Sequence, residues 1–318
     1  MKLSWFKALG SFFLAAVLTV PGFGTNSGAA NTAVPGTLNF VEGQASIQNQ
    51  PVTAKSVGSA DLAAGQTIST AGNGRAEVLL TPGVFLRLDH DSTVKMISPD
   101  ITNTKVLLEQ GRAELEVAEL HDQNNLQVVE GDATTHIDKV GLYGFSAPDN
   151  QVRVFKGQAN VLEGDENVKV KGGHEVTLDT PKLKSVGFDK KSDENDFYNW
   201  SALRSEYLSE ASANAAQVYI AGGPGWIGPG WYWDQAFFGY TFVPGAGLLY
   251  SPFGPWGFYS PGYLYSYGPI YGRPFYGHGS HYVARPGVRF AHPAGPRIGF
   301  RGGPAMHAGM GFHGGFRH

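Results

Sequence analysis

One short unit occurs four times in this chain: a glycine, then glutamine or arginine, then alanine, any residue and an aliphatic residue. The copies begin at Gly43, Gly74, Gly111 and Gly157, and each leads into or lies inside a strand-like segment. A unit that recurs every few dozen residues indicates a repetitive β architecture, in which no unit buries its apolar face alone. Glycine permits a tight turn, so we interpret each unit as a turn of the backbone next to a strand, with the glutamine or arginine facing water.

Short strands separated by turns are predicted for residues 36–183. In Arg112–Val117 the residues alternate with period two, which predicts that Glu114 and Glu116 face solvent. Lys169 and Lys171 are expected in solvent for the same reason. The turn signals are Gly72-Asn73-Gly74, Thr81-Pro82-Gly83, Ser98-Pro99-Asp100, Glu163-Gly164-Asp165 and Lys171-Gly172-Gly173. This pattern predicts an all-β fold, a repetitive β-solenoid or β-sandwich-like domain, rather than βαβ units.

A helical period replaces the alternation over residues 192–217. The apolar positions recur three or four residues apart, and Asp193, Glu194 and Asp196 suit the positive end of a helix dipole. The sequence Gly222-Gly223-Pro224 ends the pattern. We predict one amphipathic helix that packs across the end of the β domain and covers its last open strand edge. A helix that binds a partner is the alternative.

Beyond this helix the composition changes to glycine, proline and aromatic residues. Of the 40 aromatic residues (20 Phe, 14 Tyr, 6 Trp), 24 lie beyond position 220. The aromatic segment, residues 221–281, is expected to form short hairpins, because Trp231–Phe242 alternates partly and Val243-Pro244-Gly245 resembles a turn. Residues 282–318 are rich in glycine, arginine and histidine, a composition that predicts a disordered, low-complexity tail.

The first 30 residues have the layout of a secretory signal peptide. A short basic start, Met1–Lys7, precedes the apolar run Ala8–Val20, and small residues follow Pro21-Gly22. The apolar run is shorter than the ~20 residues a membrane span prefers, which favours cleavage over an uncleaved anchor. The chain has no cysteine, which fits an exported protein that does without disulfides. We therefore expect a location in the periplasm or at the cell surface.

The net charge is distributed unevenly along the chain. Since the whole chain carries −3, the first 30 residues +2 and the residues from 221 onward +5 (six arginines, one aspartate), residues 31–220 carry −10. Nucleic-acid binding needs a basic footprint on the folded domain. An acidic domain of this kind argues against a nucleic-acid partner.

The order of features in the middle of the chain resembles the FecR-like domain, a family named for a ferric-citrate sensor and anti-sigma regulator of bacterial envelopes. The resemblance covers residues 36–215 and implies a β domain with a sensing or binding role. It is carried by Leu38–Ala45, Leu62–Thr70, Gly74–Leu80, Pro82–Leu88, Leu107–Ala113, Val152–Val161, Gly172–Leu178 and Phe197–Trp200 with Arg204.

Two departures from the family pattern bear on function. Regulatory members carry a cytoplasmic anti-sigma segment before a membrane span, whereas here only Met1–Lys7 is expected on the cytoplasmic side, which argues against sigma-factor control. The family's Arg-Gly-Thr element is absent, and Asp138–Phe145 takes its place. The tail lies outside the resemblance, although similar glycine-, tyrosine- and tryptophan-rich tails accompany some exported FecR-like proteins.

The sequence predicts no catalytic centre and no bound cofactor. Acidic pairs such as Asp89 with Asp91 and Glu114 with Glu116 are two residues apart on one strand face, whereas a glycosidase needs two carboxylates opposed across a cleft. His278 and His281 are the best candidates for loose metal binding, but a glycine-rich segment offers no preformed ligand geometry. We therefore expect neither an enzyme nor a dedicated metal site.

Tryptophans of the aromatic segment are the candidate binding residues, because indole rings serve in stacking and at interfaces. They are Trp226, Trp231, Trp233 and Trp256. Two hypotheses follow: a module that binds an envelope protein or cell-wall glycan, and a structural surface or matrix protein whose tail self-associates. An anti-sigma type signalling regulator is a third. The alternative for the aromatic segment is an appendage that packs its rings on itself or on the helix.

Overall fold

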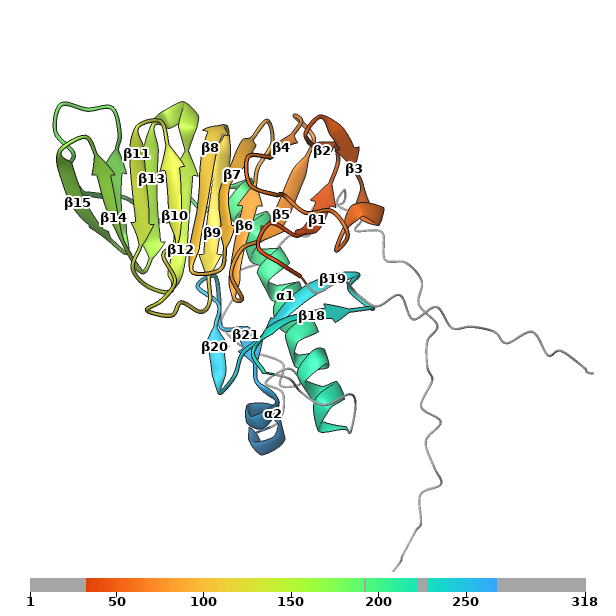
Figure 1. The fold of residues 1–318 in the computed structure, drawn as a ribbon. Coiled ribbons are helices and arrows are strands. Elements are labelled where there is room, and N and C mark those ends of the chain that lie inside the picture. The colour runs from red at the N-terminus through yellow and green to blue at the C-terminus, as the bar shows by residue number, and fades with distance from the viewer. Residues whose placement is uncertain (1–32, 192, 222–227, 268–318) are drawn as a thin grey trace, which may run out of the picture.

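The computed structural model describes residues 33–191, 193–221 and 228–267. The expected signal peptide, Trp226, His278, His281 and the tail 282–318 lie outside the described residues. Within them the chain forms a two-sheet β-sandwich, one long helix, two short hairpins and a final short helix (Figure 1). The predicted fold class, all-β with a sandwich-like domain followed by one long helix, is confirmed.

The 8-stranded sheet has the order β1 (Leu38–Glu42), β5 (Arg75–Leu79), β6 (Val84–Leu88), β9 (Arg112–Val117), β12 (Gly141–Ser146), β13 (Gln151–Lys156), β16 (His174–Thr177) and β17 (Val186–Gly187). The 9-stranded sheet has the order β15 (Glu166–Lys171), β14 (Gln158–Glu163), β11 (Ala133–Ile137), β10 (Gln127–Glu130), β8 (Asn103–Gln110), β7 (Thr93–Asp100), β4 (Thr67–Thr70), β2 (Ala45–Ile47) and β3 (Gln50–Val52). Short 3-10 turns lie at Ala54–Ser56 and Ala147–Asp149.

One apolar core fills the space between the two sheets. It takes alternate residues of each strand, such as Val78 and Leu115 from the 8-stranded sheet and Val106 and Val161 from the 9-stranded sheet. The chain advances along the sandwich from β1–β3 to β15, as the colours in Figure 1 show. This layout is the sandwich that the alternation predicts.

All four repeated glycines lie where the chain passes from one sheet to the other. Gly43 and Gly157 lead from the 8-stranded into the 9-stranded sheet, and Gly74 and Gly111 lead back. A side chain has no room there: a Cβ on Gly43 would collide with the Asn73 carbonyl, and one on Gly74 with the Gln44 carbonyl. The repeated unit is therefore a corner element, at which a strand bends and changes sheet.

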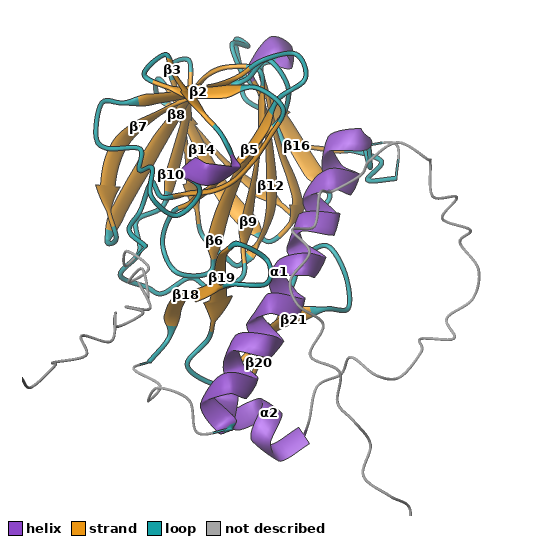
Figure 2. Cartoon of the chain, turned by 90° about the vertical axis from the view of Figure 1, so that its right-hand side faces the viewer, coloured by secondary structure: helices purple, strands orange, loops and turns teal. Residues whose placement is uncertain are grey.

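The long helix α1 (Asp196–Ile220) lies along the outer face of the 8-stranded sheet (Figure 2). Its side chains reach β1, β5 and β9, because Trp200 contacts Glu42, Arg204 contacts Glu77 and Ser205 contacts Glu116. The helix contacts the edge strand β1 through Trp200, and its predicted role as a cover for an open strand edge stays a prediction. It covers a sheet face, because that face carries polar groups that need partners.

The C-terminal elements pack around the second half of α1. They are the hairpin β18 (Gly230–Asp234) with β19 (Gly239–Val243), the hairpin β20 (Leu248–Tyr250) with β21 (Gly257–Tyr259), and α2 (Pro261–Tyr267). The aromatic segment does form short hairpins, but the first one turns between Asp234 and Gly239 and pairs Trp231 with Phe242, whereas the sequence predicts the turn at Val243-Pro244-Gly245. Together with Leu79, Phe85 and Leu208 the residues of this first hairpin form a second apolar cluster between the hairpin, the helix and the sheet.

Two further expectations fail. Ser98, Pro99 and Asp100 continue β7, and the turn follows at Ile101-Thr102, because Pro99 is tolerated near the end of the strand. Glu114 and Glu116 are buried rather than solvated, since the face they share is covered. Lys169 and Lys171 are exposed, as predicted. Neither helix in the described part of the chain combines the length and the apolar character that a membrane span requires.

The corner glycines make a direct stability prediction. Gly43→Ala should lower the free energy of unfolding by about 3 kcal/mol or more, because the methyl group would meet backbone and not a movable side chain. Gly164→Ala is the matched control: its φ is +56°, against +64° at Gly43, but open space surrounds it. The free energy of unfolding of the control should fall by only about 1–2 kcal/mol, which is the cost of placing alanine in the left-handed conformation. Equal losses in urea denaturation would contradict the corner interpretation.

Candidate functional site

A row of charged residues crosses the outer face of the 8-stranded sheet. The strand register aligns one outward-facing residue from each of six neighbouring strands, and the row is Glu77, Arg87, Glu114, Gly144, Arg153 and Glu175. Opposite charges directly across strands stabilise a sheet. The five charged residues alternate in sign along the row, and Gly144, which has no side chain, stands between Glu114 and Arg153.

Arg87 holds the first part of this row together. Its Nε lies 2.8 Å from Glu77 Oε2, and its Nη2 lies 2.8 Å from Glu116 Oε2. All three side chains are 0% exposed. A buried charge is tolerated only when partners replace the lost water, so this arginine and its two carboxylates depend on one another.

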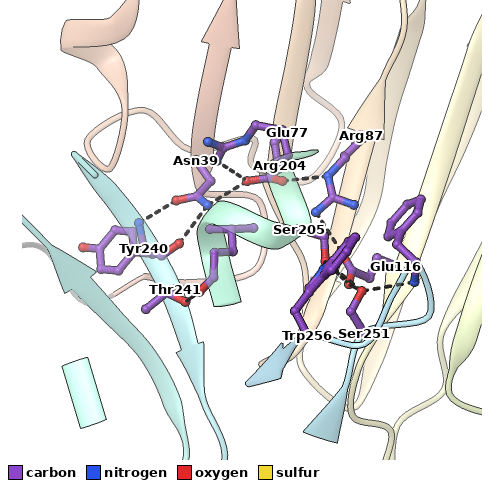
Figure 3. A network of polar contacts seen from close by, with 12 residues as sticks. Asn39, Glu77, Arg87, Glu116, Arg204, Ser205, Tyr240, Thr241, Ser251 and Trp256 are labelled. Atoms are coloured by element: carbon purple, nitrogen blue, oxygen red, sulfur yellow. Dashed lines mark hydrogen bonds and ion pairs between the residues drawn. The ribbon is translucent and has the colours of Figure 1, made fainter. Parts of the chain in front are cut away.

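Helix α1 and hairpin β18–β19 complete the shell around Glu77 (Figure 3). Arg204 Nη2 and Asn39 Nδ2 each lie 2.9 Å from Glu77 Oε1. Asn39 also accepts from the Tyr240 amide at 2.7 Å and donates to the Tyr240 carbonyl at 2.9 Å. The Arg204 guanidinium lies 4.0 Å from the Phe40 ring centroid. One side chain from β1 thus ties the sheet to a hairpin 201 residues later in the sequence.

The shell around Glu116 comes from α1 and from the segment between β20 and β21. Ser205 and Ser251 donate to Glu116 Oε1 at 2.7 and 2.8 Å, and Trp256 Nε1 lies 3.2 Å from Ser205 Oγ. Figure 3 shows both shells, joined through Arg87. The sandwich, the helix and the C-terminal segment therefore share one polar network.

The network fixes the protonation of its members. Burial alone would raise the pKa of Glu77, but Arg204, Arg87 and the hydrogen bonds to the carboxylate hold it below its ordinary value. Burial opposes the charge of Arg87, and the Glu116 and Glu77 carboxylates overcome it and raise its pKa. Glu77 and Arg87 are therefore ionised in the folded protein at neutral pH.

Serines on the buried face of α1 bind the C-terminal hairpin. Ser209 Oγ donates to the Gly257 carbonyl at 2.5 Å and accepts from the Gly257 amide at 3.0 Å. Ser212 accepts from the Tyr259 amide at 2.9 Å. Ser201, Ser205, Ser209 and Ser212 are all fully buried. Their spacing of three or four residues is the sequence signal for this packed polar face, which the apolar positions of the helix do not reveal.

A polar cleft of about 230 Å³ opens where the charge row is interrupted at Gly144. Strands β9, β12 and β13 form its floor, and the residues before α1 form one wall. Its lining includes Arg112, Glu114, Gly144, Ser146, Asp149, Gln151, Arg153, Phe155, Asp193, Asn195 and Phe197. A Cβ on Gly144 would lie 3.1 Å from the Phe155 ring, so the glycine leaves room for that ring at the floor of the cleft.

Most charges of the cleft are already paired. Arg112 Nη2 lies 3.3 Å from Asp149 Oδ2, which also accepts from Ser146 at 2.6 Å. Arg153 Nε lies 2.9 Å from Glu175 Oε2 and 3.6 Å from Asp193 Oδ2. Hydrogen bonds from Ser146 and Arg112 outweigh partial burial and lower the pKa of Asp149.

Glu114 is the exception in the cleft. It is 5% exposed, and Glu114 Oε2 makes no hydrogen bond in the part of the chain that is described. Burial raises the pKa of its carboxyl group to about 7, although Ser201 and Arg87 nearby oppose the shift. Ser201 Oγ lies near this carboxyl group but likewise has no hydrogen-bonding partner among the described residues. Glu114 therefore has unused hydrogen-bonding capacity.

The candidate tryptophans do not form one exposed platform. Trp231 packs edge-on against Phe85 at 5.1 Å between ring centroids, and Trp233 against Tyr240 at 5.1 Å. Trp256 lies on the other side of the network, where it donates to Ser205. All three are half-buried. Their contacts match the alternative of an appendage that packs its rings on the domain, and a role in ligand binding stays a prediction.

The other candidate groups are held by the chain itself. Asp89 pairs with Arg75 at 2.9 Å, and His90 Nδ1 contacts the Gly74 carbonyl at 2.9 Å. Among residues 33–191, 193–221 and 228–267, no group of three or more histidine, aspartate or glutamate side chains is placed to hold a metal ion. The expected metal candidates, His278 and His281, are not among these residues.

A comparison with protein families matches part of the sandwich. The family model described as FecR protein matches residues 66–165, which run from β4 to β14 and include three of the four corner glycines. The chain therefore carries a FecR-type domain, and the resemblance drawn from the sequence is confirmed over these residues. The match supports a sensing or regulatory module. No curated protein matches this chain.

Two solved structures of one protein are also similar to this chain. Both are of a candidate anti-sigma factor from Parabacteroides distasonis ATCC 8503, at 2.50 and 1.65 Å resolution. Each shares 14% sequence identity with this chain and has a TM-score of 0.35. The match covers 44% of this chain and 64% of the solved chain, which is less than two thirds of that protein's length.

Arg87 carries the first prediction from this site. Arg87→Met should lower the free energy of unfolding by about 3–5 kcal/mol, because Glu77 and Glu116 would keep their burial and lose their shared counter-charge. Arg112→Met is the control, since its pair with Asp149 is 49% and 47% exposed. Arg112→Met should lower the free energy of unfolding by about 1 kcal/mol or less. Chemical denaturation followed by tryptophan fluorescence measures both, and similar losses would contradict the network's role.

Glu130 carries a prediction about pH. It is 4% exposed, neither carboxyl oxygen has a hydrogen-bonding partner among the described residues, and burial raises its pKa to about 8. The folded state therefore holds this proton more tightly than the unfolded state, so stability falls as pH rises from about 4.5 to 8. At pH 8 the free energy of unfolding of Glu130→Gln should exceed that of the wild type by about 2–4 kcal/mol, and at pH 4.5 the two values should differ little.

Thermal unfolding at both pH values measures this difference. Glu166→Gln removes an exposed glutamate and serves as the control for the change in net charge. If Glu130→Gln stabilises the protein equally at pH 4.5 and pH 8, the raised pKa of Glu130 is contradicted.

Proposed function

We propose that this chain is an exported, non-catalytic envelope protein whose FecR-type domain acts as a sensing module for a protein or a cell-wall polymer. The observation that carries the proposal is the FecR match over residues 66–165. The leader-like first 30 residues and the absence of cysteine support export. Function still has to be argued from a site, since one fold serves many roles.

The chemistry of the described residues favours binding over catalysis. Glu77 and Glu116 are held between arginines and serines in the sheet-to-helix network, so they are not free to transfer protons. The cleft at Gly144 has polar, mostly paired side chains on a sheet floor. Rigid strands that present a few polar groups suit recognition of a polar ligand.

Capture of an envelope component tests the proposal. The purified full chain is sedimented with isolated peptidoglycan and, separately, cross-linked in a solubilised envelope fraction, with captured proteins identified by mass spectrometry and bound again in purified form. We expect saturable binding to one of the two. The heat-denatured chain is the control. Failure of both arms would contradict the sensing module.

A structural surface protein is the second candidate, and exposed tyrosines favour it. Tyr250, Tyr265 and Tyr267 are 57%, 81% and 78% exposed, and α2, which carries the last two, packs on α1, whose end exposes Val218 and Ile220. Exposed aromatic patches promote self-association. Under this alternative the full chain should form larger species as its concentration rises in sedimentation velocity, and the double variant Tyr265→Ser, Tyr267→Ser should not.

A further inference from the structure

Charged residues are almost absent from the C-terminal part of the fold. Residues 211–272 contain no lysine, arginine, histidine or glutamate and one aspartate, Asp234, whereas about a quarter of the residues of an average soluble domain are charged. Asp234 ends β18, where it accepts hydrogen bonds from two backbone amides of the turn. This turn lies toward the sandwich, because Tyr240 directly after it binds Asn39 of β1. The other end of this part of the fold therefore carries no charged side chain among the described residues.

That other end consists of residues 213–220 of α1 and of helix α2, and we call it the distal end. It lies opposite the sandwich in both views of the molecule (Figure 1, Figure 2). Helix α2 packs on α1 through Leu264, which shares an apolar cluster with Ala213 and Ala216. The large apolar and aromatic side chains that the distal end exposes are Val218 (53%), Ile220 (38%), Tyr265 (81%) and Tyr267 (78%). Exposed apolar surface of this kind marks a site for a protein or a membrane.

The sequence that continues from the distal end is basic. Residues 268–318 contain six arginines and no acidic residue, which gives a net charge of +6. The first of these, Arg273, is six residues beyond Tyr267, so the chain length keeps it within about 20 Å of the distal end. Residues 31–210 carry −10, since residues 211–220 add no charge to the −10 of residues 31–220. An acidic sandwich, an uncharged distal end and a basic continuation therefore follow one another.

From this order of charges we propose that the distal end docks on the surface of a membrane that contains anionic phospholipids. Val218 and Ile220 enter the boundary between headgroups and acyl chains, and the tyrosine rings lie at the level of the headgroups, where an apolar ring with a polar tip is favoured. The arginines attract the lipid phosphates. The acidic sandwich stays at the far side of the molecule, away from the negative surface. The inference goes beyond the proposed function, since it concerns where the chain is held and not what it senses.

Charge favours a membrane over a second copy of this chain as the occupant of the distal end. Two distal ends in contact would bring the six arginines of each copy together, and like charges oppose association. An anionic membrane has the opposite sign and attracts the same arginines. A small apolar surface joined to a basic segment is also the two-signal combination that gives stable membrane binding.

Flotation with lipid vesicles tests the inference. The protein is the chain without its first 30 residues, which would bind lipid by themselves and precede every described element. Vesicles of phosphatidylcholine and phosphatidylglycerol in equal parts are compared with vesicles of phosphatidylcholine alone. We expect binding to the anionic vesicles to be about tenfold tighter or more, and to weaken as salt is added. No binding to the anionic vesicles, or equal binding to both kinds, would overturn the proposal.

A pair of double variants makes the test specific to the distal end. Tyr265→Ser with Tyr267→Ser should weaken binding to the anionic vesicles about tenfold or more, because two rings no longer leave water. Ile101→Ser with Val186→Ser is the control, since it removes two side chains that are 47% and 48% exposed on the sandwich, and it should leave binding unchanged. All four side chains are exposed, so both variants should fold, which thermal unfolding checks. Unchanged binding in the tyrosine variant, or an equal loss in the control, would overturn the proposal.

Hydrogen–deuterium exchange on the anionic vesicles locates the contact. We expect slower exchange in residues 213–220 and in α2, and no change in β2 and β15 of the sandwich. Protection of the sandwich without protection of the distal end would overturn the proposal. Sedimentation velocity without lipid covers the competing occupant: larger species together with a failure to bind vesicles would assign the distal end to self-association and overturn the proposal as well.

Discussion

Arg87 is the interaction on which the arrangement of the whole molecule depends. It stands on β6 in the middle of the 8-stranded sheet, fully buried, between the carboxylates of Glu77 and Glu116. Those carboxylates in turn bind Arg204 and Ser205 of α1 and Ser251 of the C-terminal segment. A sheet face with such a charge pattern must either meet water or be covered by groups that satisfy it. Here a helix and two hairpins cover this face, so the outer face of the 8-stranded sheet is buried.

The cover is polar as well as apolar. Leu208, Phe242 and Phe258 pack against Leu79 and Phe85 of the sheet. The serines of the helix meanwhile bind backbone groups of β21 at Gly257 and Tyr259. Buried hydrogen-bonded networks contribute little net stability, but each member is costly to remove alone. This combination fixes one orientation of the helix on the sheet, and with it the wall of the cleft at Gly144.

The sequence allowed the strand pattern and the helix to be predicted, because each follows from local period. The sequence also located the corner glycines, but it did not show that the chain changes sheet at them. Which sheet a strand joins is decided by pairing between residues far apart in the sequence. Glu114 and Glu116 were expected in solvent because alternation identifies two faces and cannot tell that both are covered. The cleft was unpredictable for the same reason, because it requires Glu114, Gly144 and Arg153 to be aligned on neighbouring strands.

The polar network also has a consequence for the order in which the protein is built. Ser251 follows Glu116 by 135 residues, and Tyr240 follows Asn39 by 201. Most of the sandwich is therefore synthesised before the groups that satisfy its outer face exist, and contacts this distant in sequence form slowly. Until residues near 250 arrive, Glu116 lacks one of its donors. The C-terminal hairpins, which are made long after the strands they cover, thus close the outer face of the sandwich.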